Sequence, residues 1–367
     1  MRFTRLSLCF VPLCIALVTP APAQQAEDDR GFLTGLIEDA TSGLGREVRL
    51  EGFEGALSSR ATVAAITIAD DTGVWLRLED ASLQWNRAAL LSGEIRIEEL
   101  AADRIILNRV PEPAGGPEVP SAQATPFALP DLPVSVEIGE IRAERIEIAE
   151  PFLGEPVSAR LAGALSLVGG LADAELTLER VDAKTGRFAL DARYDEAAGQ
   201  LALSLVAEEG QDGIAARMLG LPGRPALRLE VAGDAPITAF DAELALATDG
   251  AERVTGRFQL GREGDASEAG DETWFNLALT GDLRPLLQKD YHPFFGPSSS
   301  MLVSGVREAE GALDLTSLSI EAEQLRLGGS ARIGAQGWPE AFDLTGRMAA
   351  ADGQPVRLPV SGPRTEV

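Results

Sequence analysis

Residues 95–107 read Ile-Arg-Ile-Glu-Glu-Leu-Ala-Ala-Asp-Arg-Ile-Ile-Leu, and residues 136–148 read Val-Glu-Ile-Gly-Glu-Ile-Arg-Ala-Glu-Arg-Ile-Glu-Ile. The two stretches align without a gap, and apolar residues coincide along their whole length. Apolar and polar residues largely alternate in both, and a period of two places the apolar side chains on one face of a β-strand. The alternation slips by one residue across Ala102 and Ala143, which predicts a β-bulge in each copy. The sequence therefore predicts an internal β-repeat, with a third, partial copy at 320–327.

The same alternation extends on both sides of this repeat. It covers residues 47–110 and, after an interruption, residues 134–367. We therefore expect a mostly β protein with a first β-module over 47–110 and a longer β-repeat region over 134–367. The interruption at 111–133 holds seven prolines, which cannot sustain a central strand. This segment is predicted to be a Pro-rich linker.

The apolar residues of the repeat, with those of a strand before it, are the candidate functional surface. They would line one side of a continuous sheet, and an acyl chain gains about 0.8 kcal/mol for each methylene that it buries on such a surface. The candidates are Leu76, Leu78, Ile95, Ile97, Leu100, Ile105, Leu107, Val136, Ile138, Ile141, Ile146 and Ile148. A closed β-sandwich core has the same alternation, and the pattern alone favours that alternative. The low aromatic content of 5% favours the open surface, because aromatic residues supply much of the area of closed cores.

The N-terminus predicts export from the cytoplasm. Residues 1–23 have two arginines before an apolar run and end in Ala-Pro-Ala, which is typical of a signal peptide that is either cleaved or retained as a signal anchor. Both cysteines, Cys9 and Cys14, lie in this run, so the mature chain is predicted to lack disulfide bonds. Residues 28–46 carry apolar residues at intervals of three and four, which predicts a short amphipathic helix.

The charge of the chain argues against nucleic acid as a partner. The sequence has 57 acidic and 32 basic residues, and its formal net charge is −25. A field of this sign repels phosphate backbones and also disfavours adsorption to an anionic membrane surface.

The sequence offers little for catalysis, and we expect no enzyme, no cofactor and no metal site. His292 is the only histidine, which excludes sites built from several histidines, and the Gly-x-Ser-x-Gly and Gly-Lys-Ser/Thr motifs are absent. A loop histidine packed among its aromatic neighbours is the simpler interpretation of His292. Asp70 and Asp71 precede Thr-Gly, so they are predicted to form a turn and not a pair of catalytic acids.

Several segments resemble a known family. They are Gly73-Val-Trp-Leu-Arg-Leu-Glu-Asp-Ala-Ser-Leu-Gln-Trp-Asn-Arg87, Ala89-Leu-Leu-Ser-Gly93, the strand-like stretch 48–57, and the later markers 291–296, 337–339 and 358–362. In these segments the chain is similar to the N-terminal region of the TamB family, the translocation and assembly modules with AsmA-like β-repeats. The distinctive part of the resemblance is 48–110.

The resemblance implies an elongated, curled antiparallel sheet, the β-taco, whose apolar inner face forms a groove between the inner and outer membranes. It implies phospholipid as a ligand and TamA, a BamA-like outer-membrane barrel, as a partner, with the inner membrane contacted through the N-terminus if that segment is uncleaved. Family members are usually much longer than this chain and end in a domain that contacts the barrel. The region 134–367 is therefore expected to be incomplete at its C-terminus.

Two functions are consistent with the sequence. The first, which the resemblance implies, is a periplasmic, inner-membrane-associated factor that binds phospholipid acyl chains for transport to the outer membrane, or that supports outer-membrane protein and autotransporter assembly and secretion. The second is a β-scaffold that binds no lipid and contacts an outer-membrane or secreted partner through exposed strand edges.

Overall fold

The computed structural model describes residues 47–55, 59–86, 88–89, 94–111, 135–262, 273–308, 311–350 and Val356. The described residues form seventeen strands in a single sheet. The strands are β1 (Glu47–Glu51), β2 (Arg60–Asp70), β3 (Gly73–Trp85), β4 (Glu94–Leu107), β5 (Ser135–Ile148), β6 (Val157–Val168), β7 (Leu171–Arg180), β8 (Gly186–Asp195), β9 (Gln200–Glu209), β10 (Leu227–Pro236), β11 (Ala239–Thr248), β12 (Ala251–Arg262), β13 (Thr273–Gly281), β14 (Ser299–Arg307), β15 (Leu313–Glu321), β16 (Leu325–Ile333) and β17 (Pro339–Met348). The predicted mostly β fold and its long open sheet are confirmed.

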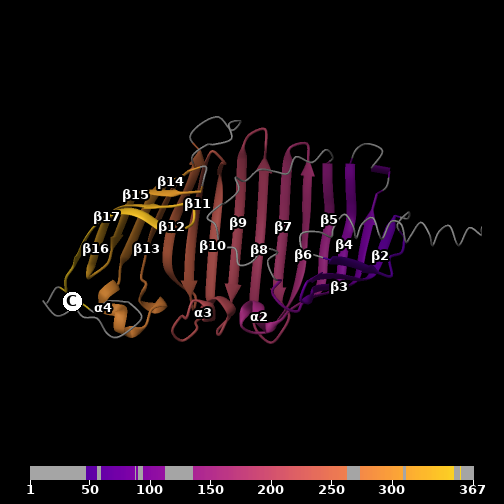
Figure 1. The fold of residues 1–367 in the computed structure, drawn as a ribbon, viewed down its shortest axis with the longest axis horizontal. Coiled ribbons are helices and arrows are strands. Elements are labelled where there is room, and N and C mark those ends of the chain that lie inside the picture. Colours follow the sequence, from indigo (N-terminus) through magenta and orange to yellow (C-terminus); the bar gives the residue numbers. More distant parts are fainter. Residues whose placement is uncertain are drawn as a thin grey trace, which may run out of the picture.

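Each strand pairs with the strands before and after it in the sequence, so the sheet is built in chain order from β1 to β17. Figure 1 shows the strands side by side along the longest axis of the molecule, with their direction turning from β2 and β3 at one end to β17 at the other. This turn is the twist that L-amino acids impose on strands.

One pairing differs from the antiparallel expectation. Strands β4 and β5 are parallel, and their register is Ile95 to Val136, Ile97 to Ile138, Leu100 to Ile141, Ile105 to Ile146 and Leu107 to Ile148. The two copies of the sequence repeat therefore lie directly beside each other, position by position. Parallel strands require a crossover connection of a dozen or more residues, and the chain between β4 and β5 has that length.

The predicted bulges have a mixed outcome. The pairing of β5 with β6 shifts between Ala143 and Ile146, as predicted, and shifts a second time between Ile138 and Ile141. Ala102 pairs with Ala81 and with Ala143, and neither pairing shifts in register beside it, so the pairing shows no bulge at the second predicted position. The third copy at 320–327 was predicted to be a bent strand, and this is wrong. It contains the turn between β15 and β16, because Leu325 and Leu327 pair with the next strand and fold back on Ile320.

Short helices interrupt the sheet after every fourth strand. Helix α2 (Glu150–Leu153) lies between β5 and β6, α3 (Ile214–Met218) between β9 and β10, and η2 (Arg284–Leu286), η3 (Lys289–Tyr291) and α4 (His292–Phe295) lie between β13 and β14. Figure 1 places α2, α3 and α4 along the same long edge of the sheet. The described chain thus contains four-strand units, β2–β5, β6–β9, β10–β13 and β14–β17.

The local sequence explains where these helices stop. In α2, Pro151 occupies the first turn, where its missing N–H costs nothing, and Gly154 ends the helix in the left-handed conformation at φ 72°. Pro285 likewise stands in the first turn of η2.

The sheet is a single layer with a sparse core. The buried apolar residues are mostly small, as at Ala65, Ala143 and Ala159, and Thr248 is the largest side chain that is fully buried among the described residues. Side chains that neighbour each other on one face shield small residues between them, but a second layer would be needed to bury large ones. A closed β-sandwich core is therefore not the arrangement of the described residues.

Three expectations lie outside the described residues. They are the signal peptide or anchor at 1–23, the amphipathic helix at 28–46 and, apart from Pro111, the Pro-rich linker at 111–133.

Candidate functional site

The twelve candidate residues all lie on one face of three adjacent strands. Residues that are directly paired across neighbouring strands share a face of the sheet. Leu76 pairs with Leu107, which pairs with Ile148, and Leu78 is joined in the same way to Ile105 and Ile146. The remaining candidates, Ile95, Ile97, Leu100, Val136, Ile138 and Ile141, are paired with one another across β4 and β5.

The apolar face continues far beyond these strands, which the sequence-based candidates missed. One row of directly paired residues crosses the sheet from β2 to β17 with a small or apolar residue on every strand. Its members are Ala61, Leu83, Leu100, Ile141, Gly163, Leu176, Leu190, Leu205, Val231, Leu244, Gly256, Leu279, Met301, Ile320, Leu327 and Gly346. The signal for the later strands was present in the same alternation, for example in Gln-Leu-Ala-Leu-Ser-Leu at 200–205.

No second layer of the described residues covers this face. Leu100 is 40% exposed, Leu165 is 38% exposed and Phe188 is 36% exposed. Most other large side chains of the face are partly exposed, because they contact only their neighbours in the same layer. We call this surface, defined by the row above and its flanking rows, the apolar face.

The opposite face is charged and carries ladders of ion pairs. Arg104 Nη1 lies 3.2 Å from Glu79 Oε2, and its Nε lies 3.1 Å from Glu147 Oε1. Arg142 Nη2 likewise lies 2.7 Å from Glu99 Oε1 on the neighbouring strand. These arginines bridge carboxylates on adjacent strands, so the polar face is neutralised locally in spite of the acidic composition.

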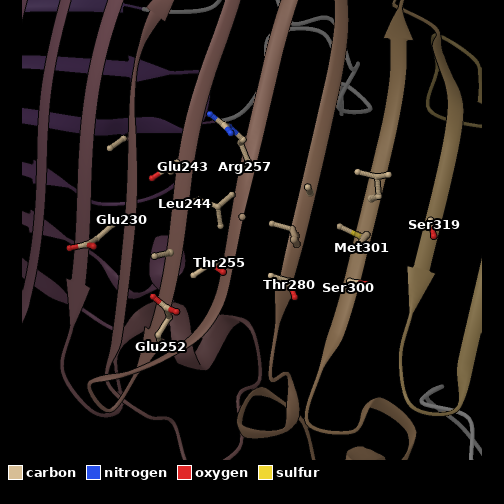
Figure 2. Close-up of a pocket in the computed structure, with 16 residues that line it drawn as sticks. Glu230, Glu243, Leu244, Glu252, Thr255, Arg257, Thr280, Ser300, Met301 and Ser319 are labelled. Carbon is tan, nitrogen blue, oxygen red and sulfur yellow. The ribbon is translucent and has the colours of Figure 1, made fainter.

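Two hollows of the described surface are lined mainly by side chains of the polar face. One hollow has a volume of about 750 Å³ and extends from β10 to β15. Figure 2 shows the carboxylates of Glu230, Glu243 and Glu252 on one side of it and the hydroxyls of Thr280 and Ser300 on the other. A smaller hollow of about 250 Å³ crosses β5–β8 and is lined by charged side chains of the same face.

A partly buried ion cluster joins the helical inserts at the long edge of the sheet. Glu155, which follows α2, accepts hydrogen bonds from Arg180 Nη1 at 3.1 Å, Lys184 Nζ at 2.5 Å and Arg217 Nη1 of α3 at 3.0 Å. The hydrogen bond from Arg217, with those from Lys184 and Arg180, lowers the pKa of Glu155 to about 2. The carboxylate therefore stays ionised and ties three segments together.

The residues weighed for chemistry have structural roles. Asp70 Oδ1 accepts hydrogen bonds from the backbone N–H and the hydroxyl of Thr72, so the predicted turn is confirmed. The ring Nε2 of His292 donates to the carbonyl oxygen of Leu287 at 3.1 Å, which fixes the start of α4. Within the described ranges, no group of three His, Cys, Asp or Glu side chains is placed to hold a metal ion.

Comparison with known proteins adds no assignment. No protein-family model, no curated protein and no solved structure matches the chain. In the part of the chain that the structure describes, no helix has the length and apolar content that crossing a bilayer requires.

Proposed function

We propose that the apolar face binds the acyl chains of phospholipids. The observation that supports this is the row of small and aliphatic residues that crosses the sheet from β2 to β17 without a polar side chain and without a covering layer. Each methylene that an acyl chain places on this surface gains about 0.8 kcal/mol, so a chain of ordinary length gains enough to remain bound. Leu, Ile and Val side chains offer no fixed hydrogen-bonding groups, and the surface would therefore accept many acyl chains without selecting one.

The wider role proposed here is lipid transport through the periplasm towards the outer membrane, together with support for outer-membrane protein and autotransporter assembly. In this role the sheet is a curled groove of the β-taco, AsmA-like kind, residues 1–23 associate the protein with the inner membrane, and a TamA-like barrel is the partner. The likeness of residues 48–110 to the TamB family supports this role. A continuous face fits it better than a closed pocket, because a lipid can move along the face while its chains stay buried.

The test compares charges placed on the two faces of one strand. Ile105 belongs to the apolar face, whereas Ile106 pairs with Arg77 and Glu147 on the polar face. The protein and its Ile97→Asp, Ile105→Asp and Ile138→Asp variants are purified without detergent, and bound phospholipid is quantified by mass spectrometry. We expect the apolar-face variants to lose most of the lipid and Ile106→Asp to retain it, since a carboxylate is costly beside an acyl chain only where the chain lies.

Circular dichroism of each variant shows whether the sheet has remained intact. Equal lipid loss in Ile105→Asp and Ile106→Asp, or a wild-type protein that carries no lipid at all, would reject the proposal. If lipid is absent and the protein crosslinks to an outer-membrane barrel, the alternative of a β-scaffold without a lipid function is correct.

A further inference from the structure

The two outer strands of the described sheet end it in different ways. Strand β1 has five residues and carries Glu47, Arg49 and Glu51, as outer strands do that resist pairing with other chains. Strand β17 has ten residues, all of them exposed, and among the described strands it pairs with β16 alone. An exposed edge of this length is a template for another strand.

Large apolar side chains gather on β17. Phe342, Leu344 and Met348 are 74%, 42% and 45% exposed. With Gly346 they occupy alternate positions of the strand, and Gly346 pairs with Leu327 in the apolar row, so all four belong to the apolar face. Because so much of these side chains is exposed, a strand that paired with β17 would remove apolar area from water.

The polar face of β17 carries charges that the sheet itself does not neutralise. Arg347 pairs directly with Arg326 on β16, and like charges directly opposite each other are destabilising. Asp343 lies on the same face, opposite Ser330. Within the described ranges, neither Asp343 nor Arg347 forms an ion pair. The outer strand thus presents one guanidinium and one carboxylate that are available to a partner.

These charges make β17 complementary to itself. When a second copy runs antiparallel beside it with Thr345 opposite Thr345, Asp343 of each copy lies opposite Arg347 of the other. Two opposite-charge pairs then form across the strands, one on each side of the central threonines. A register shifted by one step in either direction opposes Thr345 to one of these charges and leaves both pairs unmade.

The apolar face fits the same register. Phe342 lies opposite Met348 of the second copy, and a thioether contacts an aromatic ring favourably. Leu344 lies opposite Gly346, which already has Leu327 on its other side. A Cβ atom at Gly346 would lie 3.2 Å from Cδ1 of Leu327, so the missing side chain leaves room for large neighbours.

The same arrangement of a glycine between two leucines occurs inside the sheet. Gly256 on β12 pairs with Leu244 on β11 and with Leu279 on β13. A Cβ atom at Gly256 would lie 2.4 Å from Cδ2 of Leu279 and 3.4 Å from Cγ of Leu244. The leucines therefore fill the space above the glycine. Pairing of two β17 strands would repeat this row with Gly346 between Leu327 and Leu344 of the second copy.

We propose that two copies of the chain pair antiparallel through residues 342–348 of β17 and form a dimer with one continuous sheet. The two-fold axis passes between the two Thr345 residues and is perpendicular to the sheet, so both apolar faces lie on the same side. The apolar row that reaches Gly346 then continues into the second copy. Charge complementarity is the reason that a second copy, and not an unrelated strand, is the occupant of this edge.

Charge reversal in the full chain tests the register. The dimer dissociation constant is measured by sedimentation velocity over a range of protein concentrations. Asp343→Arg places like charges opposite each other at both ends of the interface, and we expect it to raise the constant by about ten-fold or more. Addition of Arg347→Asp restores both pairs and should return the constant to within about three-fold of its original value.

Circular dichroism shows whether each variant keeps the sheet. The proposal is overturned if the unaltered protein is monomeric, because another segment of the chain or a different partner would then occupy the edge. It is also overturned if the double variant dimerises no better than Asp343→Arg, since the dimer would then use another register or another surface.

Disulfide trapping provides an independent test, in a background with Cys9→Ser and Cys14→Ser. In the proposed register Thr345 lies opposite itself, and opposed Cα atoms of an antiparallel pair are about 4.5–5.5 Å apart, which a disulfide can bridge. The control is Ala341→Cys, on the same face of the same exposed strand. Its two copies would be more than about 20 Å apart at the rise of a β-strand.

Under mild oxidation we expect Thr345→Cys to give a disulfide-linked dimer at least several-fold more than Ala341→Cys. Equal crosslinking of the two variants, or none in Thr345→Cys, contradicts the proposed pairing. The substituted residues lie on the polar face and the readout is dimerisation, so the outcome is independent of whether the apolar face binds lipid.

Discussion

At the scale of single residues, burial decides which of the many ion pairs matter. Glu155 is 14% exposed and holds three cations, whereas Asp173 and Arg193 form a pair whose side chains are 42% and 73% exposed. Water screens an exposed pair, and ordering two long side chains opposes its attraction. Removal of the less exposed carboxylate, Glu155, instead leaves several cations facing one another.

We therefore expect Glu155→Gln to destabilise the edge between α2 and α3 by about 2 kcal/mol at pH 7, equivalent to about 30-fold faster hydrogen exchange. The measurement is exchange over β6–β8 by mass spectrometry. Asp173→Asn is the matched control and is expected to change stability by less than about 0.5 kcal/mol. Equal effects of the two substitutions would contradict the role assigned to burial.

The same residue predicts a dependence on pH. Because the folded-state pKa of Glu155 is lowered from 4.5 to about 2, the unfolded chain takes up a proton first as the pH falls. The stabilisation is complete above pH 4.5 and is lost as the pH falls towards 2. The difference in hydrogen-exchange rate over β6–β8 between the unaltered protein and Glu155→Gln should therefore become smaller as the pH falls from 4.5 to 2. A difference that stays constant down to pH 2 would contradict the stabilising role assigned to ionised Glu155.

Two glycines on neighbouring parts of the sheet should respond to alanine in opposite directions. At Gly305 a Cβ would lie 2.6 Å from the carbonyl oxygen of Asp314, whereas at Gly328 the nearest atom, the carbonyl oxygen of Leu318, is 3.6 Å away. Gly305→Ala is expected to destabilise by about 1–2 kcal/mol through overpacking. Gly328→Ala is expected to stabilise by about 0.5 kcal/mol, because it restricts the unfolded chain. Urea unfolding of both variants measures the contrast.

At the scale of elements, the alternation of apolar residues was sufficient to predict strands and their shared face. It could not predict the direction of pairing, because Ile95 and Ile97 alternate in the same way beside a parallel or an antiparallel neighbour. The sequence repeat does contain a signal for the parallel pair. Equivalent residues of the two copies, such as Ile95 and Val136, can all lie side by side only if β4 and β5 run in the same direction. The prediction for the third copy was wrong because apolar residues such as Ile320 and Leu327 can be spaced in this way on two strands joined by a turn as well as on one strand.

The alternation of apolar residues does not predict the four-strand unit either. Its helical inserts differ in length and composition, and its constant features are a few glycines and prolines such as Gly233 and Pro225. These residues become a pattern only after the pairing shows that each precedes or interrupts the first strand of a unit. The sequence predicted an apolar face on β3, β4 and β5 but not its continuation to β17. The strands after Ile148 do not repeat the sequence of β4 and β5, so their apolar residues were not chosen as candidates.

At the scale of the whole molecule, the sheet has no centre on which its stability depends. Every extensive contact between the described strands joins sequence neighbours. Such an arrangement resembles a linear array, in which stability is a sum over units and their nearest-neighbour interfaces. A local defect should then remain local, unlike a defect in a domain with one shared core.

Proline in the middle of β8 tests this expectation. Ala189 pairs with Thr177 on β7 and with Val206 on β9, and Ala189→Pro removes its N–H and with it one ladder hydrogen bond. We expect hydrogen exchange to accelerate over β7–β9 while β2–β5 and β14–β17 keep their protection, because no contact transmits the loss directly. Ala197→Pro is the control, since Gly199 N–H donates to Glu196 O across a turn whose second position accepts proline. Uniform loss of protection from β2 to β17 would contradict this expectation, because it would mean that the whole sheet unfolds cooperatively. The cooperativity would then have to come from a ligand or partner that covers the apolar face and connects distant strands.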